Sequence, residues 1–328
     1  MAFYLWMGVF NMVAVAQLWA FANDLFAHDR GKRLLPVVGV GATLGALIGS
    51  GGTAALFSGV GAYPLMLIAA IGMLVPIPLT IAVHRREAHL HELSGIPEDE
   101  AEAPIGKRGG FELVLKDRYL FLIAMLVLTF SLVNTLGGFI LNMMITDEAA
   151  RLVATGEAGG RAQRELIGTL AGTVQTWVNL LAFLLQTFVV SRLLKSIGVR
   201  GALFVLPIIA LGGYISIAAL PLLGVVRITK ILENSTDYSL QNTTRHALFL
   251  PTSREAKYKA KQAIDAFFVR FGDMLQALVV FVGTALAFGV RQFAIVNIVL
   301  VVIWLLIATA IVREHRKIAP VEAEEKAA

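Results

Sequence analysis

Apolar segments long enough to cross a lipid bilayer recur along the whole of this chain. A helix needs about 20 predominantly apolar residues to span the hydrocarbon core of a membrane. Eight segments meet this requirement: 3–23, 34–57, 63–83, 119–145, 166–190, 202–222, 263–288 and 293–312. Because 57% of the 328 residues are apolar and only 16% are charged, a soluble domain could not bury them. We expect an all-α, polytopic membrane protein; the composition excludes a soluble enzyme, a DNA-binding module and a secreted scaffold.

A ninth segment, residues 225–248, is so polar that hydropathy alone would assign it to a loop. Loops rich in Lys and Arg stay on the cytoplasmic side of a membrane, so their distribution tests whether this segment crosses. If it crosses, twenty basic residues lie on one side and four on the other. If it does not, the split is thirteen against fourteen, which defines no orientation. The sequence therefore predicts nine spans and a cytoplasmic C-terminus.

The nine predicted spans fall into two groups. Residues 1–84 hold three helices and form an incomplete N-terminal bundle, and residues 119–313 form a C-terminal bundle of six. A charged, Pro- and Glu-containing cytoplasmic linker at 85–118 separates the groups, and a polar cytoplasmic tail occupies 314–328. Nine spans place the N-terminus outside, where the chain begins within its first helix. We expect either a start that was assigned too late or a protein that is a remnant or a fragment.

Charged side chains enter the predicted membrane region at two adjoining spans. A charge at the centre of a membrane helix costs about 2.5–3.5 kcal/mol on insertion scales, so such residues are rare and face the protein interior. The charged and amide residues singled out as candidate site residues are Arg227, Lys230, Glu233, Asp237, Gln241 and Arg245 on the first span, and Arg270 and Asp273 on the second. Positions 227, 230, 234, 237, 241 and 245 follow one another in steps of three or four and therefore lie on one helical face, which reads Arg, Lys, Asn, Asp, Gln, Arg. Such a helix must line water or be enclosed by other helices.

Two interpretations of these charges remain open. In the first, they form internal salt bridges whose role is to fix the packing of the helices. For Arg270 and Asp273, whose i,i+3 spacing suits such a pair, this interpretation is as well supported as the second. The second interpretation is a solute pathway in which basic groups (Lys230, Arg245 and Arg270) attract an anion. Acidic groups (Glu233, Asp237 and Asp273) would then balance those charges in the empty state or carry a coupled ion. The variety of polar groups on one face favours the pathway.

Other patterns in the chain carry less information. The basic run 254–261 is explained by cytoplasmic anchoring, so no nucleic acid is expected as a partner. Residues 252–255, TSRE, have capping-box spacing and predict the start of a helix. The histidines at 84, 89 and 91 lack carboxylates at ligand spacing. Nothing has the spacing of a catalytic site, so we expect no enzyme, no metal and no cofactor.

The polar block resembles a known family of membrane proteins. Residues 233–251, ENSTDYSLQNTTRHALFLP, with TSREAKYKAK at 252–261 and IDAFFVRFGD at 264–273, resemble the tenth and eleventh helices of bacterial and plastid ATP/ADP-translocase-like transporters of the major facilitator superfamily. The opening FYLWMGVFN, then WAFAND at 19–24 and GKRL at 31–34, is similar to that family's fourth helix and the following loop. The nine spans would then correspond to helices four to twelve of twelve, without helices one to three.

The resemblance implies a transporter that works by alternating access on an anionic, nucleotide-like solute, with ATP/ADP exchange as the expected activity. It also implies a multi-pass protein of the bacterial inner membrane, with the lipid bilayer as its surroundings. The sequence leaves open a carrier of another solute, coupled to protons through Glu233 or Asp237. It also leaves open a non-transporting scaffold, a sensor or an inactive remnant. The oligomeric state is not predicted.

Overall fold

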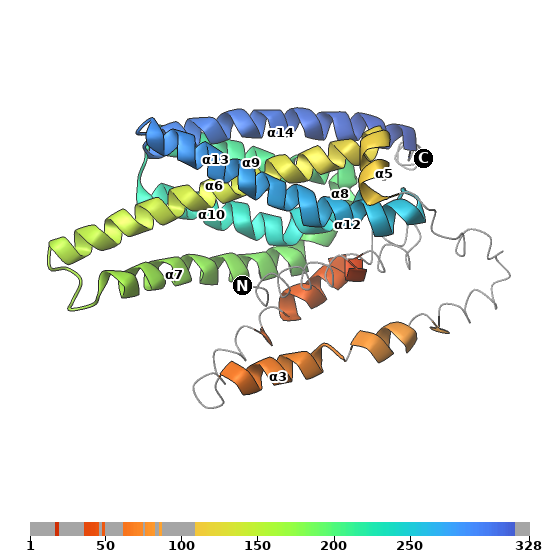
Figure 1. Cartoon of the computed structure of the whole chain (residues 1–328), viewed down its shortest axis with the longest axis horizontal. Coiled ribbons are helices and arrows are strands. Elements are labelled where there is room, and N and C mark those ends of the chain that lie inside the picture. Colours follow the sequence, from red (N-terminus) through yellow and green to blue (C-terminus); the bar gives the residue numbers. More distant parts are fainter. Residues whose placement is uncertain are drawn as a thin grey trace. The chain divides into compact units, whose positions relative to one another are not determined.

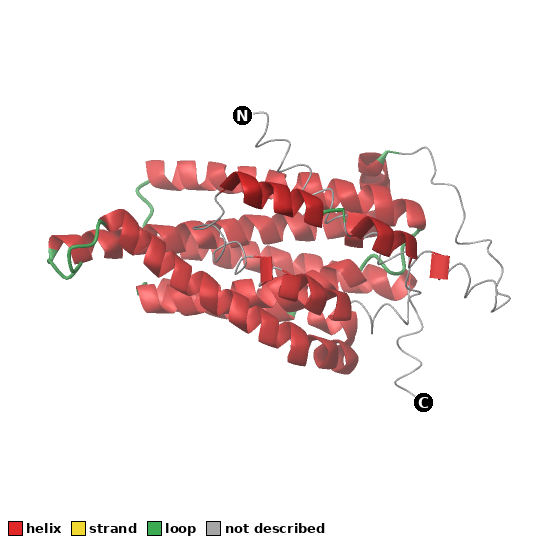
Figure 2. Cartoon of the chain, turned by 90° about the horizontal axis from the view of Figure 1, so that it is seen from below, coloured by secondary structure: helices red, strands yellow, loops and turns green. Residues whose placement is uncertain are grey.

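The computed structural model describes residues 17–19, 36–45, 48–49, 62–74, 76–82, 85–86 and 109–318. Within these ranges every regular element is a helix (Figure 2). The chain divides into two compact units, residues 1–40 together with 108–328, and residues 41–107. The second unit contains α3 (Ala62–Gly72) and a further helical stretch at 76–82. The first unit holds the remaining named helices and all of the candidate site residues.

The helices of the first unit follow one another with few interruptions. In chain order they are α5 (Gly110–Lys116), α6 (Arg118–Ala154), α7 (Gln163–Leu184), η2 (Leu185–Val190), α8 (Ser191–Ala202), α9 (Val205–Ala219), α10 (Leu223–Thr236), η3 (Asp237–Gln241), α11 (Asn242–Ala247), η4 (Ala256–Ala260), α12 (Lys261–Ala263), η5 (Ile264–Phe268), α13 (Val269–Ala285) and α14 (Val290–Ile318). The elements marked η are π-helical turns inside longer helices. The longer helices run side by side along the unit (Figure 1).

Four of the described helices are long and apolar enough to cross a membrane: Arg118–Ala154, Gln163–Ala202, Ala256–Ala285 and Val290–Ile318. They contain most of the predicted spans 119–145, 166–190, 263–288 and 293–312, and the predicted span 202–222 becomes the shorter apolar helix α9. The described residues of predicted span 34–57 are helical, and those of span 63–83 are helical except for a turn at 73–74. Most of span 3–23, of the linker 85–118 and of the tail 314–328 lies outside the described residues. The chain is an all-α, multi-pass membrane protein.

Helix α6 is the centre of the first unit, where it packs against α7, α10, α13 and α14. The carboxylate of Asp117 caps its N-terminus by accepting hydrogen bonds from the backbone N–H groups of Tyr119 (2.8 Å) and Leu120 (3.3 Å). Apolar side chains buried along α6 meet large side chains such as Trp304 of α14. By contrast, Phe281 of α13 and Leu306 of α14 are exposed, as expected for side chains that face lipid.

Two glycine-dependent features fix how α6 meets its neighbours. A Cβ atom at Gly272 would lie 2.7 Å from the carbonyl oxygen of Leu128, so the missing side chain lets α13 approach the α6 backbone closely. The turn from α6 to α7 contains Gly156, Gly159 and Gly160 with φ values of 76°, 60° and 80°. Glycine adopts this left-handed conformation without steric cost, which permits the tight reversal.

Candidate functional site

Residues 223–247 form one continuous helix, called here the polar helix, through α10, η3 and α11. At 1.5 Å per residue its length is about 37 Å, which exceeds the roughly 30 Å of a bilayer core. The polar helix packs against α6, α7 and α9 in the same unit (Figure 1). The segment that hydropathy alone would assign to a loop is therefore a helix that packs against three neighbours, with Ile228 and Tyr238 exposed on its outer side. That it crosses the membrane stays a prediction from the distribution of basic residues.

A buried ion pair lies near the middle of this unit. Lys230 Nζ donates to Glu233 Oε2 (2.9 Å) and to the side-chain oxygen of Asn134 on α6 (2.7 Å). The hydroxyl of Tyr214 on α9 donates to the same glutamate oxygen at 2.9 Å. The Lys230 and Glu233 side chains are only 2% and 0% exposed. We call Asn134, Tyr214, Lys230 and Glu233 the Lys230 cluster; it joins three helices through charge-assisted hydrogen bonds.

The Lys230 cluster depends on Gly137, one turn along α6 from Asn134. A Cβ atom at Gly137 would lie 2.0 Å from the Tyr214 hydroxyl oxygen and 3.1 Å from Lys230 Nζ. Only a residue without a side chain leaves room for both groups. At the neighbouring Gly138, a Cβ atom would meet no described atom within 4 Å.

A second cluster forms around Asp273 on α13. Its Oδ1 accepts hydrogen bonds from the hydroxyls of Ser131 (2.8 Å) and Thr135 (2.9 Å) on α6. Its Oδ2 lies 3.2 Å from Arg270 Nη1, which confirms the contact expected from their i,i+3 spacing. The Arg270 side chain is 62% exposed and Asp273 32% exposed. These four residues are called the Asp273 cluster, and their arrangement leaves the guanidinium of Arg270 accessible.

A third cluster, which sequence reasoning missed, lies at the C-terminal end of the polar helix. Lys261 belongs to the basic run that the sequence places in a cytoplasmic loop, but it is 0% exposed and lies 2.6 Å from Asp265 Oδ2. Its ammonium group also donates to His246 Nδ1 at 2.8 Å, because an ammonium can only donate. The His246 ring stacks on Trp19, with centroids 3.9 Å apart. We call Trp19, His246, Lys261 and Asp265 the Lys261 cluster.

The polar helix also carries buried polar atoms that have no hydrogen-bond partner among the described residues. They include Asn234 Oδ1, both amide atoms of Gln241 and Arg245 Nε. Asp237, the first residue of η3, and Arg227 on α10 are half-buried. An unsatisfied buried polar group costs about 1–3 kcal/mol, so a concentration of them on one helix marks a place where a polar ligand or water can bind.

The eight predicted site residues therefore fall into two groups, four that form ion pairs and four that do not in the described part of the chain. The structure joins Lys230 to Glu233 and Arg270 to Asp273 in ion pairs, although Glu233 Oε1 is buried without a hydrogen-bond partner among the described residues. The other four stay on one face of the polar helix without an ion pair in the described part of the chain: Arg227, Asp237, Gln241 and Arg245. The partners Tyr214 and Asn134 were not in the predicted site. The signal that could have found Tyr214 is its hydroxyl in a helix whose other residues, apart from Ser216, are apolar or glycine. The corresponding signal for Asn134 is an amide within the apolar predicted span 119–145.

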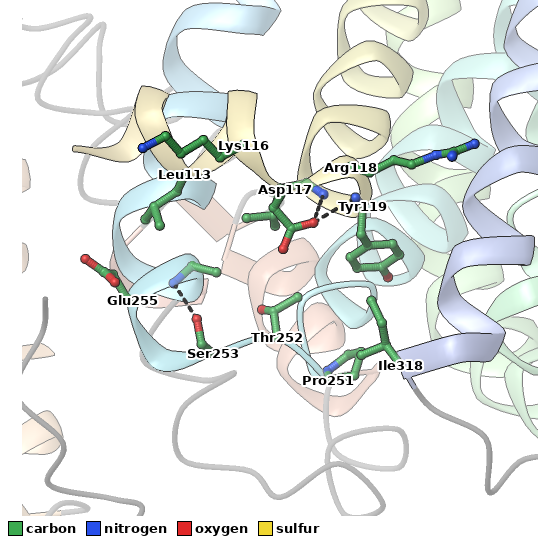
Figure 3. A pocket seen from close by; sticks show the side chains of 12 residues that line it. Leu113, Lys116, Asp117, Arg118, Tyr119, Pro251, Thr252, Ser253, Glu255 and Ile318 are labelled. Atoms are coloured by element: carbon green, nitrogen blue, oxygen red, sulfur yellow. Dashed lines mark hydrogen bonds between the residues drawn. The ribbon is translucent and has the colours of Figure 1, made fainter. Parts of the chain in front are cut away.

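A cavity of about 660 Å³ lies elsewhere in the unit, between the start of α6, residues 251–253 and the end of α14 (Figure 3). Two of the polar side chains that line it already bond to the backbone of the protein. Asp117 caps α6, and Ser253 Oγ accepts a hydrogen bond from the backbone N–H of Ala256 at 3.3 Å. The predicted helix start at 252–255 is thereby confirmed, although the capping residue is Ser253 rather than Thr252. None of the eight predicted site residues lines this cavity.

Helices that bury charged residues inside an apolar, multi-helix unit define an integral membrane protein with a polar interior, the class to which membrane transport proteins belong. Comparison with known proteins is more specific. Residues 204–315 match the family described as TLC ATP/ADP transporter. This region contains the entire polar helix and the block 233–273 that carries the resemblance, so the resemblance to ATP/ADP-translocase-like proteins is confirmed.

Three relatives of the chain share one name, ADP,ATP carrier protein 1. The chain is 24% identical to ADP,ATP carrier protein 1 of Chlamydia pneumoniae, over 94% of this chain and 66% of the relative. It is 22% identical to ADP,ATP carrier protein 1 of Chlamydia muridarum, over 94% of this chain and 64% of the relative. The protein of the same name from Chlamydia trachomatis is 22% identical, over 89% and 60%. The chain spans about two thirds of the length of these relatives.

Proposed function

We propose that this chain is a membrane carrier that exchanges ATP for ADP by alternating access in the bacterial inner membrane. The observation that carries the proposal is the polar helix, which holds its charges inside the unit and lies wholly within the region matched to the transporter family. Its relatives bear the name ADP,ATP carrier. A carrier moves its solute without making or breaking a covalent bond, so the protein is not an enzyme.

The residues proposed to meet the solute are those on the polar helix and α13. One guanidinium group can donate two parallel hydrogen bonds to two oxygens of a phosphate. The side chains of Arg227, Arg245 and Arg270 would therefore attract the nucleotide phosphates. Arg245 Nε has no partner among the described residues, and the Arg270 side chain is 62% exposed, which leaves both able to bind. Asp237 and Asp273 would balance these charges when no solute is bound.

The Lys230–Glu233 pair would have a different part in the same site. Its hydrogen bonds to α6 and α9 hold the polar helix in place, and an incoming phosphate would compete with Glu233 for the Lys230 ammonium. The proposed organisation keeps nine spans, with a helical group at 1–84, a bundle at 119–313, and the linker 85–118, tail 314–328 and C-terminus in the cytoplasm.

The test is uptake of labelled ATP into proteoliposomes that contain the full chain and internal ADP. Uptake should depend on internal ADP and should fall at least tenfold in Arg245→Gln, because a buried phosphate contact is worth about 1.5–3 kcal/mol. The matched control is Arg164→Gln, which removes the same charge from an exposed position at the start of α7. This control should exchange at the wild-type rate.

Each result bears directly on the proposal. No ADP-dependent uptake by the reconstituted chain would remove the nucleotide assignment. Acidification that depends on another solute and disappears in Asp237→Asn would replace it with a proton-coupled carrier. Equal losses in Arg245→Gln and Arg164→Gln would show that the arginine on the polar helix has no special part in binding.

A further inference from the structure

Gln241 is the least satisfied side chain on the polar helix. It is 1% exposed, yet neither its amide oxygen nor its amide nitrogen has a hydrogen-bond partner among the described residues. Gln186 on the neighbouring η2 provides a contrast, because its amide nitrogen donates to the carbonyl of Pro36 at 2.9 Å. The enclosed position of Gln241 therefore does not explain its lack of partners, since a buried glutamine nearby has found one.

The position of Gln241 ties it to the groups proposed to meet the solute. It is the last residue of η3, and Asp237 and Arg245 lie four residues before and after it on the same face. Asn234 and Arg245, on that face, also carry buried atoms without partners among the described residues. A π-helical turn alters the direction of its side chains and occurs frequently at functional sites. The unsatisfied amide thus lies within one helical turn of a guanidinium suited to phosphate.

A primary amide presents an acceptor and a donor side by side. Its complement is a ligand edge that presents a donor beside an acceptor, and the amino group and adjacent ring nitrogen of adenine have this pattern. The N7 edge of guanine presents two acceptors instead, O6 and N7, so an amide cannot match it with both of its atoms. The opposite edge of guanine presents the O6 acceptor, the N1–H donor and the amino donor in that order. An amide that binds the N7 edge of a purine with both of its atoms therefore distinguishes adenine from guanine.

We propose that Gln241 selects the nucleobase of the transported nucleotide by binding the amino group and N7 of adenine with both amide atoms. This inference rests on the proposed nucleotide exchange and adds the residue that determines base specificity. Arg245, one turn away, binds phosphate in the same site. A bidentate side-chain contact of this kind discriminates between bases by about 5- to 150-fold. The wild-type chain should therefore prefer ATP to GTP by a factor in that range.

The decisive variant is Gln241→Glu, which keeps the shape of the side chain and replaces the donor with a second acceptor. A carboxylate opposes the ring nitrogen of adenine and matches the two adjacent donors of guanine. In proteoliposomes of the full chain, the ratio of inhibition constants for ATP and GTP against labelled ATP uptake should shift toward GTP by at least tenfold. The matched control is Gln175→Glu on α7, an exposed glutamine bonded to Asn179, which should leave the ratio unchanged.

A second variant, Gln241→Leu, removes both the donor and the acceptor. It should abolish the preference between ATP and GTP without reversing it, and nucleotide-induced stabilisation of the purified protein in detergent measures this independently of transport. An unchanged ATP-to-GTP ratio in either variant, or an equal loss of both nucleotides, would overturn the assignment of Gln241 and leave nucleotide exchange standing. Failure of the wild-type chain to exchange any nucleotide would instead remove the proposed function.

Discussion

Breaking the Lys230–Glu233 pair should destabilise the protein more when one partner is replaced than when both are. Lys230→Met leaves the Glu233 carboxylate, which is 0% exposed, with only the Tyr214 hydroxyl as a partner. Removing one member of a buried ion pair costs about 3–5 kcal/mol, because a charge remains buried without compensation. Glu233→Met should cost a similar amount by leaving the Lys230 ammonium with only Asn134.

The double variant, Lys230→Met with Glu233→Met, contains no buried charge at this position. Replacing a whole buried pair by apolar residues of similar volume is often neutral. The remaining cost is that of the Tyr214 hydroxyl without its acceptor and of the half-buried Asn134 amide oxygen without its donor, about 1–3 kcal/mol for each group that stays unsatisfied. The double variant should therefore be more stable than either single variant. Unfolding free energies measured by SDS titration in mixed micelles give this comparison.

A surface pair of the same residue types provides the control. Lys116 lies 2.7 Å from Glu112, but the two side chains are 67% and 44% exposed. Lys116→Met should change the unfolding free energy by less than about 1 kcal/mol. If the double variant at 230 and 233 were destabilised by the sum of the two single variants, the two charges would not be coupled and the reasoning would be wrong.

Three further outcomes follow from the same structure. Gly137→Ala should destabilise the protein by about 1–3 kcal/mol, since its Cβ would meet the Tyr214 hydroxyl, whereas Gly138→Ala should be neutral; equal SDS midpoints for the two would contradict this. Ser131→Ala combined with Thr135→Ala removes both hydroxyl donors to Asp273 and should lower the unfolding free energy by about 3 kcal/mol, with an unchanged value counting against these bonds. The chain has no cysteine, so Leu222→Cys and Arg254→Cys give single labelling sites at the two ends of the polar helix. An impermeant maleimide should label them from opposite sides of the membrane, and labelling from one side only would show that the helix does not cross.

Helices could be predicted from the sequence where the periodicity of polar and apolar residues within a single helix was sufficient. The spacing of charged residues and the distribution of basic residues both predicted a helix at 225–248. The polar helix occupies residues 223–247. Hydropathy set the end of α6 at 145, but the helix continues to Ala154. Beyond residue 145 the chain becomes polar while its residues still favour a helix, and Arg151 pairs with Glu148 at 2.8 Å.

The partners of the buried charges could not be predicted in the same way. Lys230 is bonded to Asn134, 96 residues earlier, and the periodicity of one helix does not say which neighbour it will meet. Lys261 counts among exposed cytoplasmic residues by sequence alone, yet His246 and Asp265 enclose it. Such contacts depend on how helices distant in sequence pack together. The contact between Arg270 and Asp273 was predictable because both lie on a single helix.

The closed ion pairs of Lys230 with Glu233, Lys261 with Asp265 and Arg270 with Asp273 bear on how the protein responds to voltage. Each pair has no net charge, and its two members lie on the same helix, so they travel together when that helix moves. A membrane potential of 100 mV does about 2.3 kcal/mol of work on one elementary charge that crosses the bilayer, but none on a neutral pair. In the carrier proposed above, these pairs would make no contribution to electrogenicity, and voltage sensitivity would arise from the cargo and the unpaired side chains.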